Sequence, residues 1–253
     1  MSRLWDMGFS NLPRLIPMHL TPQDRLFVLT GAGISAESGL ATFRGSGGLW
    51  NGHRVEEVAT PEAWDADPAL VWRFYSQRRR DALAAQPNAA HKALAQIEQR
   101  LAQTNPENFY LCTQNVDDLH ERAGSNRIHH MHGSLFESRC VRCNKPFPDQ
   151  SFYEDAKTLP TCRTCGKPIR PHIVWFGEVP LDMDAIYRKL DRATVLLVVG
   201  TSGSVYPAAG FVQIANQRGI RTIYVGPEEP LNADSFDEVI LSTATAALPK
   251  LAE

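Results

Sequence analysis

Short apolar runs alternate along this chain with longer stretches in which apolar residues recur every three or four positions. The short runs predict strands at 26–30, 109–113, 194–200, 221–225 and 238–241. The longer stretches predict helices at 89–102 and 207–218. Strands that are apolar throughout and alternate with helices are typical of a parallel sheet covered on both faces. We therefore expect an α/β protein with a doubly wound parallel sheet.

Two insertions interrupt this alternation. One lies at 45–87 and has helical character over 68–85, and the other carries most of the cysteines. We expect a main domain formed by 1–48, 87–134 and 171–253, and a smaller module with a helical part at 49–86 and a cysteine-bearing part at 135–170. A ligand cleft is expected where the insertions meet the carboxyl ends of the strands.

A glycine turn follows the first predicted strand. Gly31, Gly33 and Ala36 have the alanine-ended spacing of the dinucleotide fingerprint, and polar residues from Ser35 onward should open a helix. Such a turn brings backbone N–H groups close to a phosphate, which favours a Rossmann-like sheet. Taken alone, the turn could equally be a tight connection. Residues 42–44, which follow it, are less easily explained in that way.

Four of the five cysteines form two closely spaced pairs. Cys140 and Cys143 are separated by two residues, as are Cys162 and Cys165, and 18 residues lie between the pairs. This spacing predicts a four-thiolate structural zinc site that organises a short zinc ribbon. The alternative is two disulfides, which require an oxidising compartment. Cys112 lies in an apolar run and is interpreted as a buried strand residue.

Composition sets the outer limits of function. The 253 residues include 26 basic and 28 acidic side chains, so the net charge is only −2. This balance argues against nucleic-acid binding and against a membrane surface as partner. No apolar run reaches membrane-spanning length, and the first residues lack a secretory pattern. We expect a cytoplasmic protein, and we expect it to be a monomer.

Polar residues gather after three further predicted strands or runs. Gln114, Asn115, Val116 and Asp117 follow the strand at 109–113. His132 follows the run 127–130, while Gly200, Thr201 and Ser202 follow the strand that begins at 194. Each set alone is compatible with ordinary capping or turn chemistry. Their occurrence together at strand ends favours a ligand site.

The chain resembles the sirtuins, a family of NAD-dependent protein-lysine deacylases. The resemblance covers nearly the whole chain in the family's order and rests on the four cysteines together with GAGISAESG at 31–39, TFRG at 42–45, TQNVD at 113–117, HGS at 132–134, VWFGE at 174–178 and GTS at 200–202. It implies a Rossmann-like domain with a zinc-ribbon and helical module, NAD consumed as a co-substrate, one structural Zn²⁺, and acylated lysine side chains as substrates.

The resemblance also implies roles for particular residues. His132 would be the general base on a ribose hydroxyl, and Val174, Phe176 and Gly177 would line the groove for the substrate peptide. The implied cofactor contacts are Gly31, Ala32, Gly33, Ser35, Ala36, Phe43, Arg44, Gln114, Asn115, Val116, Asp117, Gly200, Thr201, Ser202, Gly226, Glu228 and Ala244.

The identity of the acyl group is suggested by a helical pair. Tyr75 and Arg78 stand three residues apart and share a face, where they resemble the carboxylate-reading pair of the branch that removes succinyl and malonyl groups. Ala59 occupies the place of a small residue that widens the acyl pocket in that branch. We expect weaker deacetylation besides. The alternatives are a solvated arginine face at 78–80 and an enzyme that is mainly a deacetylase.

Two positions depart from the family pattern. Gly226 stands where many members have an asparagine that helps to hold a ribose, although Glu228 follows it, and the stretch around Ala244 lacks a common glycine and proline. Two other classes remain open, namely an NAD-dependent dehydrogenase with a structural zinc and a zinc-ribbon binding module. The polar loops at 113–117 and 132–134 favour the deacylase over the dehydrogenase, and the near-neutral charge argues against a nucleic-acid-binding module.

Overall fold

The main domain is built on six parallel strands. The computed structural model describes residues 20–42, 52–154, 158–203 and 205–252, so Phe43 and Arg44 lie outside the described residues. The sheet has the order β3-β2-β1-β7-β8-β9. Its strands are β1 (Leu26–Thr30), β2 (Phe109–Thr113), β3 (Ile128–His130), β7 (Val195–Val199), β8 (Arg221–Gly226) and β9 (Glu238–Leu241).

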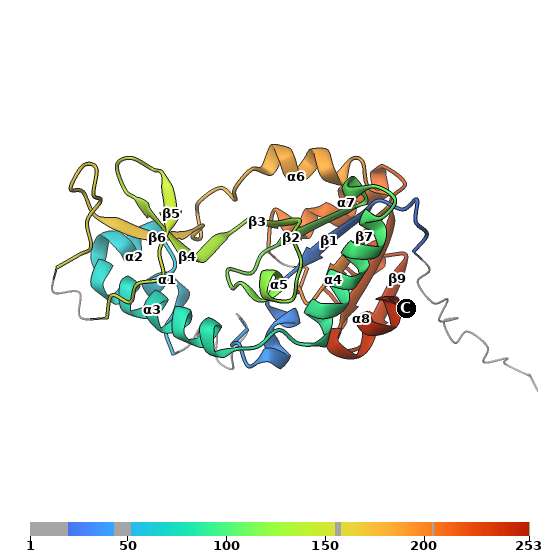
Figure 1. Cartoon of the computed structure of the whole chain (residues 1–253), viewed down its shortest axis with the longest axis horizontal. Helices are drawn as coiled ribbons and strands as arrows, with labels where there is room; N and C mark the ends of the chain where they lie inside the picture. Colours follow the sequence, from blue (N-terminus) through green and yellow to red (C-terminus); the bar gives the residue numbers. More distant parts are fainter. Residues whose placement is uncertain (1–19, 43–51, 155–157, 204, 253) are drawn as a thin grey trace, which may run out of the picture.

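The strand order reverses between β1 and β7, which is the topological switch point of a Rossmann-like sheet. Both strands are buried at every position. Strand β1 is central in the sheet, because Val28 is paired with Leu111 of β2 on one side and with Leu197 of β7 on the other. Helices cover both faces (Figure 1). Helices α4 (Ala89–Ala102) and α8 (Ala244–Ala252) pack on one face, and α6 (Met183–Leu190) and α7 (Phe211–Gln217) pack on the other.

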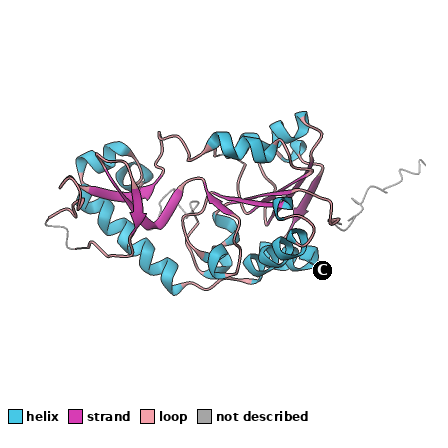
Figure 2. Cartoon of the chain, turned by 45° about the horizontal axis from the view of Figure 1, so that its top comes forward, coloured by secondary structure: helices cyan, strands magenta, loops and turns pink. Residues whose placement is uncertain are grey.

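The two insertions form a second lobe, visible apart from the main sheet in Figure 2. Its three-stranded antiparallel sheet has the order β5-β4-β6, with β4 (Gly133–Cys140), β5 (Pro146–Pro148) and β6 (Ile169–Ile173). Its helices are α1 (Val55–Val58), α2 (Pro61–Ala66) and α3 (Pro68–Ala84). Because Gly133 already pairs with Ile173, the expected boundary after residue 134 falls inside β4.

Local sequence explains where the two longer helices of this lobe begin. The Thr60 hydroxyl accepts a hydrogen bond of 3.0 Å from the Ala63 N–H, and an Asp67 carboxylate oxygen accepts one of 2.8 Å from the Leu70 N–H. In each case a proline follows the cap directly, and its fixed φ suits the first helical position. The helix expected at 68–85 therefore starts as predicted and ends at Ala84.

A buried arginine joins the two insertions. Arg79 on α3 has no exposed side-chain surface, donates hydrogen bonds to the Leu135 carbonyl and the Ser138 hydroxyl, and forms an ion pair of 3.4 Å with Asp149. Arg80 instead is exposed and pairs with Glu154. The solvated-face alternative for 78–80 is therefore wrong for Arg79, and the helical and zinc-ribbon parts pack as one unit.

Several elements differ from the sequence prediction. The strand expected at 194–200 is shorter because Gly200 has a φ of 63°, which takes the chain out of the extended conformation. The helix expected from 207 starts with a 3₁₀ turn at Ala208–Gly210. The elements not predicted are β4, β5, β6, α1, α2, α6, α8 and the short α5 (Leu119–Arg122), whereas β3 falls within the run expected at 127–130. None of the helices in the described part of the chain has the length and apolarity needed to cross a membrane.

Candidate active site

Two turns meet at the switch point. The Gly31 N–H donates to the Val199 carbonyl over 3.0 Å, and the Gly33 N–H donates to the Gly200 carbonyl over 2.8 Å. A Cβ atom on Gly33 would lie 2.7 Å from the Gly200 Cα, so a side chain there would force the turns apart. Dinucleotides bind beside such a crevice in Rossmann-like sheets. The turns after β1 and β7 therefore form one wall of the candidate site.

The expected helix after the glycine turn is wrong. Ala32–Ile34 and Ala36–Ser38 are two consecutive 3₁₀ turns, and the second ends at Gly39 with a φ of 87°. Asn88 explains this compact arrangement, because its side-chain amide donates to the Ile34 carbonyl over 2.8 Å and to the Ser38 hydroxyl over 3.0 Å.

A buried polar cluster lies between β1 and β2 at the carboxyl edge of the sheet. The Asn115 amide donates to the Ser35 hydroxyl over 3.1 Å, and that hydroxyl donates to Asp117 over 3.3 Å. Burial raises the pKa of Asp117, although the Leu119 N–H favours its charged form. The Gln114 Nε2 is buried and has no hydrogen-bond partner in the described part of the chain. A ligand with amide or hydroxyl acceptors fits this cluster.

Two buried histidines contact hydroxyl groups in and beside this cluster. His91 Nε2 lies 3.4 Å from the Ser35 hydroxyl, and His120 Nε2 lies 3.1 Å from the Thr30 hydroxyl. Burial lowers the pKa of His91 to about 4 and places that of His120 well below its usual value. Both rings are therefore neutral at pH 7. Sequence reasoning missed them, because nothing in the sequence alone places residue 91 beside Ser35.

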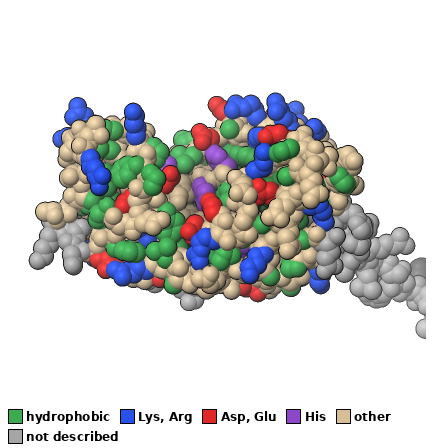
Figure 3. Space-filling model, in the orientation of Figure 1, with side chains coloured by type: hydrophobic (Ala, Val, Ile, Leu, Met, Phe, Trp, Pro, Cys, Tyr) green, Lys and Arg blue, Asp and Glu red, His purple; other side chains and the backbone are tan. Residues whose placement is uncertain are grey.

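His132 is held through one of its two ring nitrogens. It lies in the turn between β3 and β4, and its Nδ1 donates to the Gln114 carbonyl over 3.2 Å, which leaves the lone pair on Nε2. Burial lowers the pKa of His132, so the ring is neutral at pH 7. His130, by contrast, uses Nδ1 on the Asn115 carbonyl and Nε2 on Glu121. Histidine side chains line the hollow between the two lobes (Figure 3).

The acyl-pocket candidates share one apolar cluster of the small lobe. Tyr75 and Ala59 belong to it together with Trp175 and the cofactor candidate Val116. The Trp175 Nε1–H donates to the Tyr75 hydroxyl over 3.0 Å, and Tyr75 is fully buried. Burial lowers the pKa of Arg78, while the nearby Tyr75 and Asp117 oppose this shift. Arg78 therefore interacts electrostatically with the acyl-pocket candidate Tyr75 and with Asp117 of the buried polar cluster.

The peptide-groove candidates follow β6. The Val174 N–H donates to the His132 carbonyl over 2.9 Å, and the Phe176 N–H donates to the Ala59 carbonyl over 3.0 Å. Phe176 is 45% exposed, and Gly177 has a φ of 89°. The loop thus links His132, Ala59 and an exposed edge.

Glu178 fixes this loop from within. Its carboxylate accepts hydrogen bonds of 2.9 and 2.7 Å from Arg170 and one of 2.9 Å from the Trp175 N–H. The Arg170 guanidinium lies over the Trp175 ring at 3.4 Å from its centroid. Sequence reasoning missed Arg170 and Trp175, because the pairing depends on how β6 turns into the loop.

Most of the remaining cofactor candidates lie at the ends of β7 and β8, whereas Ala244 lies in the core. The Tyr224 hydroxyl donates to the carbonyls of Thr201 and Glu228. Ser202 follows Thr201 in the same turn, and Gly226 is the last residue of β8. Ala244 is buried at the start of α8 in the core beneath the sheet.

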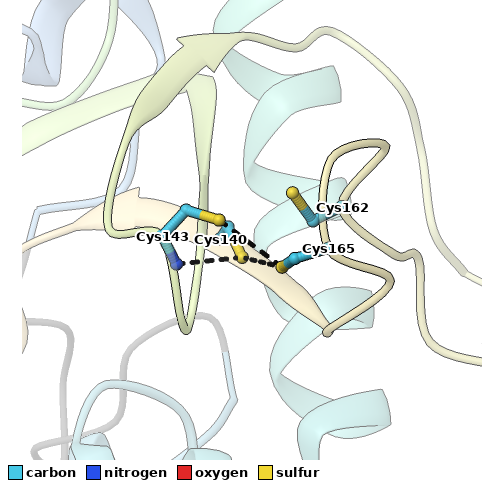
Figure 4. Close-up of side chains that lie close together, drawn as sticks. All are labelled: Cys140, Cys143, Cys162 and Cys165. Atoms are coloured by element: carbon cyan, nitrogen blue, oxygen red, sulfur yellow. Dashed lines mark hydrogen bonds between the residues drawn. The ribbon is translucent and has the colours of Figure 1, made fainter.

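The four paired cysteines converge in the small lobe (Figure 4). Their sulfur atoms all lie within 4.8 Å of one another, and Cys165 Sγ is 3.5 Å from that of Cys140 and 3.4 Å from that of Cys143. Tetrahedral zinc with Zn–S bonds of about 2.3 Å needs sulfur atoms roughly 3.8 Å apart. The cluster therefore fits a structural zinc ion, and its four ligands leave no open position for catalysis. Cys112 is buried in β2, as predicted.

Comparisons with known proteins agree with this geometry. Residues 31–207 match the Sir2 family. The chain is 50% identical over 231 residues to the NAD-dependent protein deacylase of Caulobacter vibrioides, covering 90% of this chain and 95% of that protein. It is 47% identical over 233 residues to the NAD-dependent protein deacylase of Escherichia coli (strain K12), covering 90% of this chain and 81% of that protein.

Solved structures give the same result. A Sir2 homolog–NAD complex superposes with a TM-score of 0.82 at 42% identity, covering 91% of this chain and 89% of that chain. A Sir2 variant with a deacetylated p53 peptide and 3′-O-acetyl-ADP-ribose superposes with a TM-score of 0.78 at 31% identity, covering 90% of this chain and 93% of that chain.

Proposed function

This chain belongs to the Sir2 family, and from that premise we propose that it is an NAD-dependent protein-lysine deacylase that prefers acyl groups ending in a carboxylate, such as succinyl and malonyl. NAD supplies the ADP-ribosyl group that accepts the acyl chain, and free nicotinamide and unmodified lysine are the other products. The single observation that carries the preference is the Arg78 guanidinium, which follows Tyr75 by one turn of α3 and interacts electrostatically with Tyr75 and Asp117.

The buried polar cluster orients the nicotinamide end of the co-substrate. Ser35, Asn115 and Asp117 are already held by mutual hydrogen bonds, so little reorganisation is needed when a carboxamide binds among them. Their burial excludes water from the place where positive charge develops on the sugar. The phosphates lie against the wall formed by the turns at Gly31–Gly33 and Gly200, where the glycines let the backbone come close to a ligand.

His132 moves the proton. Its Nε2 carries the lone pair, and its lowered pKa keeps that nitrogen unprotonated at neutral pH. It takes a proton from a ribose hydroxyl, which can then attack the acyl carbon. The hydrogen bond from Nδ1 to the Gln114 carbonyl holds the ring in the required tautomer and orientation.

The acyl chain binds in the apolar cluster that contains Ala59 and Tyr75. The small Ala59 leaves room for a longer chain, and the Arg78 guanidinium supplies the charge that a terminal carboxylate needs. Because the Tyr75 hydroxyl accepts a hydrogen bond from Trp175, its own hydrogen is available for an acceptor on the ligand. An acetyl group has no carboxylate and gains nothing from either side chain, so its removal is the slower reaction.

The test is a comparison of acetyl, malonyl and succinyl peptides with NAD, measured by release of nicotinamide, for the wild type and Arg78→Met. A charge-assisted hydrogen bond is worth about 1.5 to 3 kcal/mol, so kcat/KM for the succinyl peptide should fall about ten- to a hundredfold. Deacetylation should stay unchanged or rise. Arg80→Met is the matched control, because Arg80 is exposed on the same helix. Equal loss of kcat/KM on the succinyl and acetyl peptides would refute a role for Arg78 in the preference for carboxylate-ended acyl groups.

A further inference from the structure

We propose that Tyr224 is a positioning residue of the dinucleotide site, and that Gly226 is a glycine because the Tyr224 hydroxyl occupies its side-chain space. Tyr224 acts through the main chain of the two turns that follow β7 and β8. This inference rests on the proposed function, since it assigns a role within the site for NAD.

Tyr224 bridges two adjacent strand ends. Its hydroxyl lies 3.2 Å from the Thr201 carbonyl and 3.1 Å from the Glu228 carbonyl. Both carbonyls only accept, so the hydroxyl hydrogen is shared between a residue after β7 and a residue after β8. The ring is buried, and Phe236 packs against it with 5.5 Å between centroids. The tyrosine is therefore held in place and sets the spacing of the two turns.

Gly226 makes room for this bridge. A Cβ atom there would overlap the Tyr224 hydroxyl and lie 2.6 Å from the Cζ of the ring. The φ of Gly226 is not in the left-handed region, so the backbone conformation itself does not require glycine. The requirement is one of space. The side chain that is missing at residue 226 is thus replaced by a polar group from two residues earlier.

A second contact joins the same two segments. A Cβ atom on Gly203 would lie 3.1 Å from the Cγ of Asn232, which belongs to the connection between β8 and β9. The turn after β7 is therefore closely packed between this connection and the glycine turn after β1, to which Gly200 is hydrogen-bonded. A shift of Thr201 would be passed to the wall of the site. It would not reach the acyl-pocket candidates, which belong to the small lobe.

The first test is Tyr224→Phe, which removes the hydroxyl and keeps the ring. One net hydrogen bond is worth about three- to tenfold in affinity, so the Kd for ADP-ribose measured by calorimetry and the KM for NAD should both rise by that factor. The KM for the acylated peptide and kcat at saturating NAD should not change. Tyr187→Phe is the matched control, because Tyr187 packs on the same core from α6. A merely structural role would lower the melting temperature without this selective effect on the dinucleotide.

The second test is Gly226→Ala, which must displace the Tyr224 ring. As a single variant, Gly226→Ala should weaken ADP-ribose binding about as much as Tyr224→Phe does. In a Tyr224→Val background, where the space is free, it should have little further effect. Unchanged ADP-ribose binding by a folded Tyr224→Phe variant would refute the inference, as would fully additive losses in the double variant. The calorimetry needs no turnover. A wild type that binds ADP-ribose but releases no nicotinamide with acylated peptides would therefore refute the proposed function and leave the Tyr224 inference standing.

Discussion

Replacing Arg79 with methionine should destabilise the small lobe far more than the same change at its neighbour Arg80. The Arg79 side chain is 0% exposed and its partner Asp149 is 6% exposed, whereas Arg80 and Glu154 are 48% and 43% exposed. Removing one partner of a buried pair costs about 3 to 5 kcal/mol, because the other charge stays buried without compensation. A surface pair contributes about 1 kcal/mol or less.

The effect should depend on pH with a definite sign. Burial alone would raise the pKa of Asp149, but hydrogen bonds from Ser138 and Ser151 and the charge of Arg79 outweigh it, so the pKa lies below 3.8. A carboxyl with a lowered pKa contributes stability that is complete above its unfolded pKa and is lost as the pH falls through its folded pKa. The difference between wild type and Arg79→Met should therefore be largest at neutral pH and shrink below about pH 4.

The assay is urea unfolding at constant zinc, followed by tryptophan fluorescence. Trp64, Trp72 and Trp175 lie in the small lobe, so unfolding of that lobe changes the signal. Trp5 and Trp50, which lie outside the described residues, also contribute to it. Adding Asp149→Asn to the Arg79→Met variant should recover part of the loss, because it removes the uncompensated charge. The reasoning is refuted if Arg79→Met costs no more free energy of unfolding than Arg80→Met.

Four further outcomes are expected. His132→Asn should nearly abolish acyl transfer, measured as formation of the deacylated peptide, in a variant that unfolds at the wild-type temperature, and near-normal turnover would remove His132 from the mechanism. In the wild type, kcat/KM should begin to decrease only below pH 6.5 as the pH is lowered, because burial lowers the pKa of His132. A decrease that begins above pH 6.5 would contradict this. Zinc chelation or Cys140→Ser should lower the melting temperature and abolish activity, whereas Cys112→Ser should retain zinc. Trp175→Phe should reduce desuccinylation about fivefold and spare deacetylation, with no further loss in a Tyr75→Phe background; equal losses on both substrates would deny Trp175 a part in acyl selection.

The centre of the main sheet could be predicted because β1 and β7 are buried on both faces. The apolar runs that became β1 and β7 have no other good explanation, and their lengths were right to within one residue at each end. Strand β4 could not be found in this way, because buried and half-buried positions mix along it. Helix α8 contains Pro249, which argues against a helix when only local sequence is considered.

The candidate site was accessible where chemistry follows a strand end and hidden where it depends on contacts distant in sequence. The polar residues around Asn115 could be grouped in advance, but three adjacent arginines do not reveal which one is buried. That distinction depends on Asp149, which lies 70 residues away from Arg79. Gly226 looked like a loss from the sequence, and only the structure shows the Tyr224 hydroxyl in its place.

The buried arginine on α3 has a consequence for exchanging parts between relatives. Arg79 makes all its hydrogen bonds to residues of the cysteine-bearing insertion, namely Leu135, Glu137, Ser138, Asp149 and Ser151. A chimera that imports only the helical insertion would bury a guanidinium opposite a foreign surface. The two insertions therefore form a single structural unit despite their separation along the chain. Acyl selectivity should transfer from one relative to another only when both insertions are exchanged together.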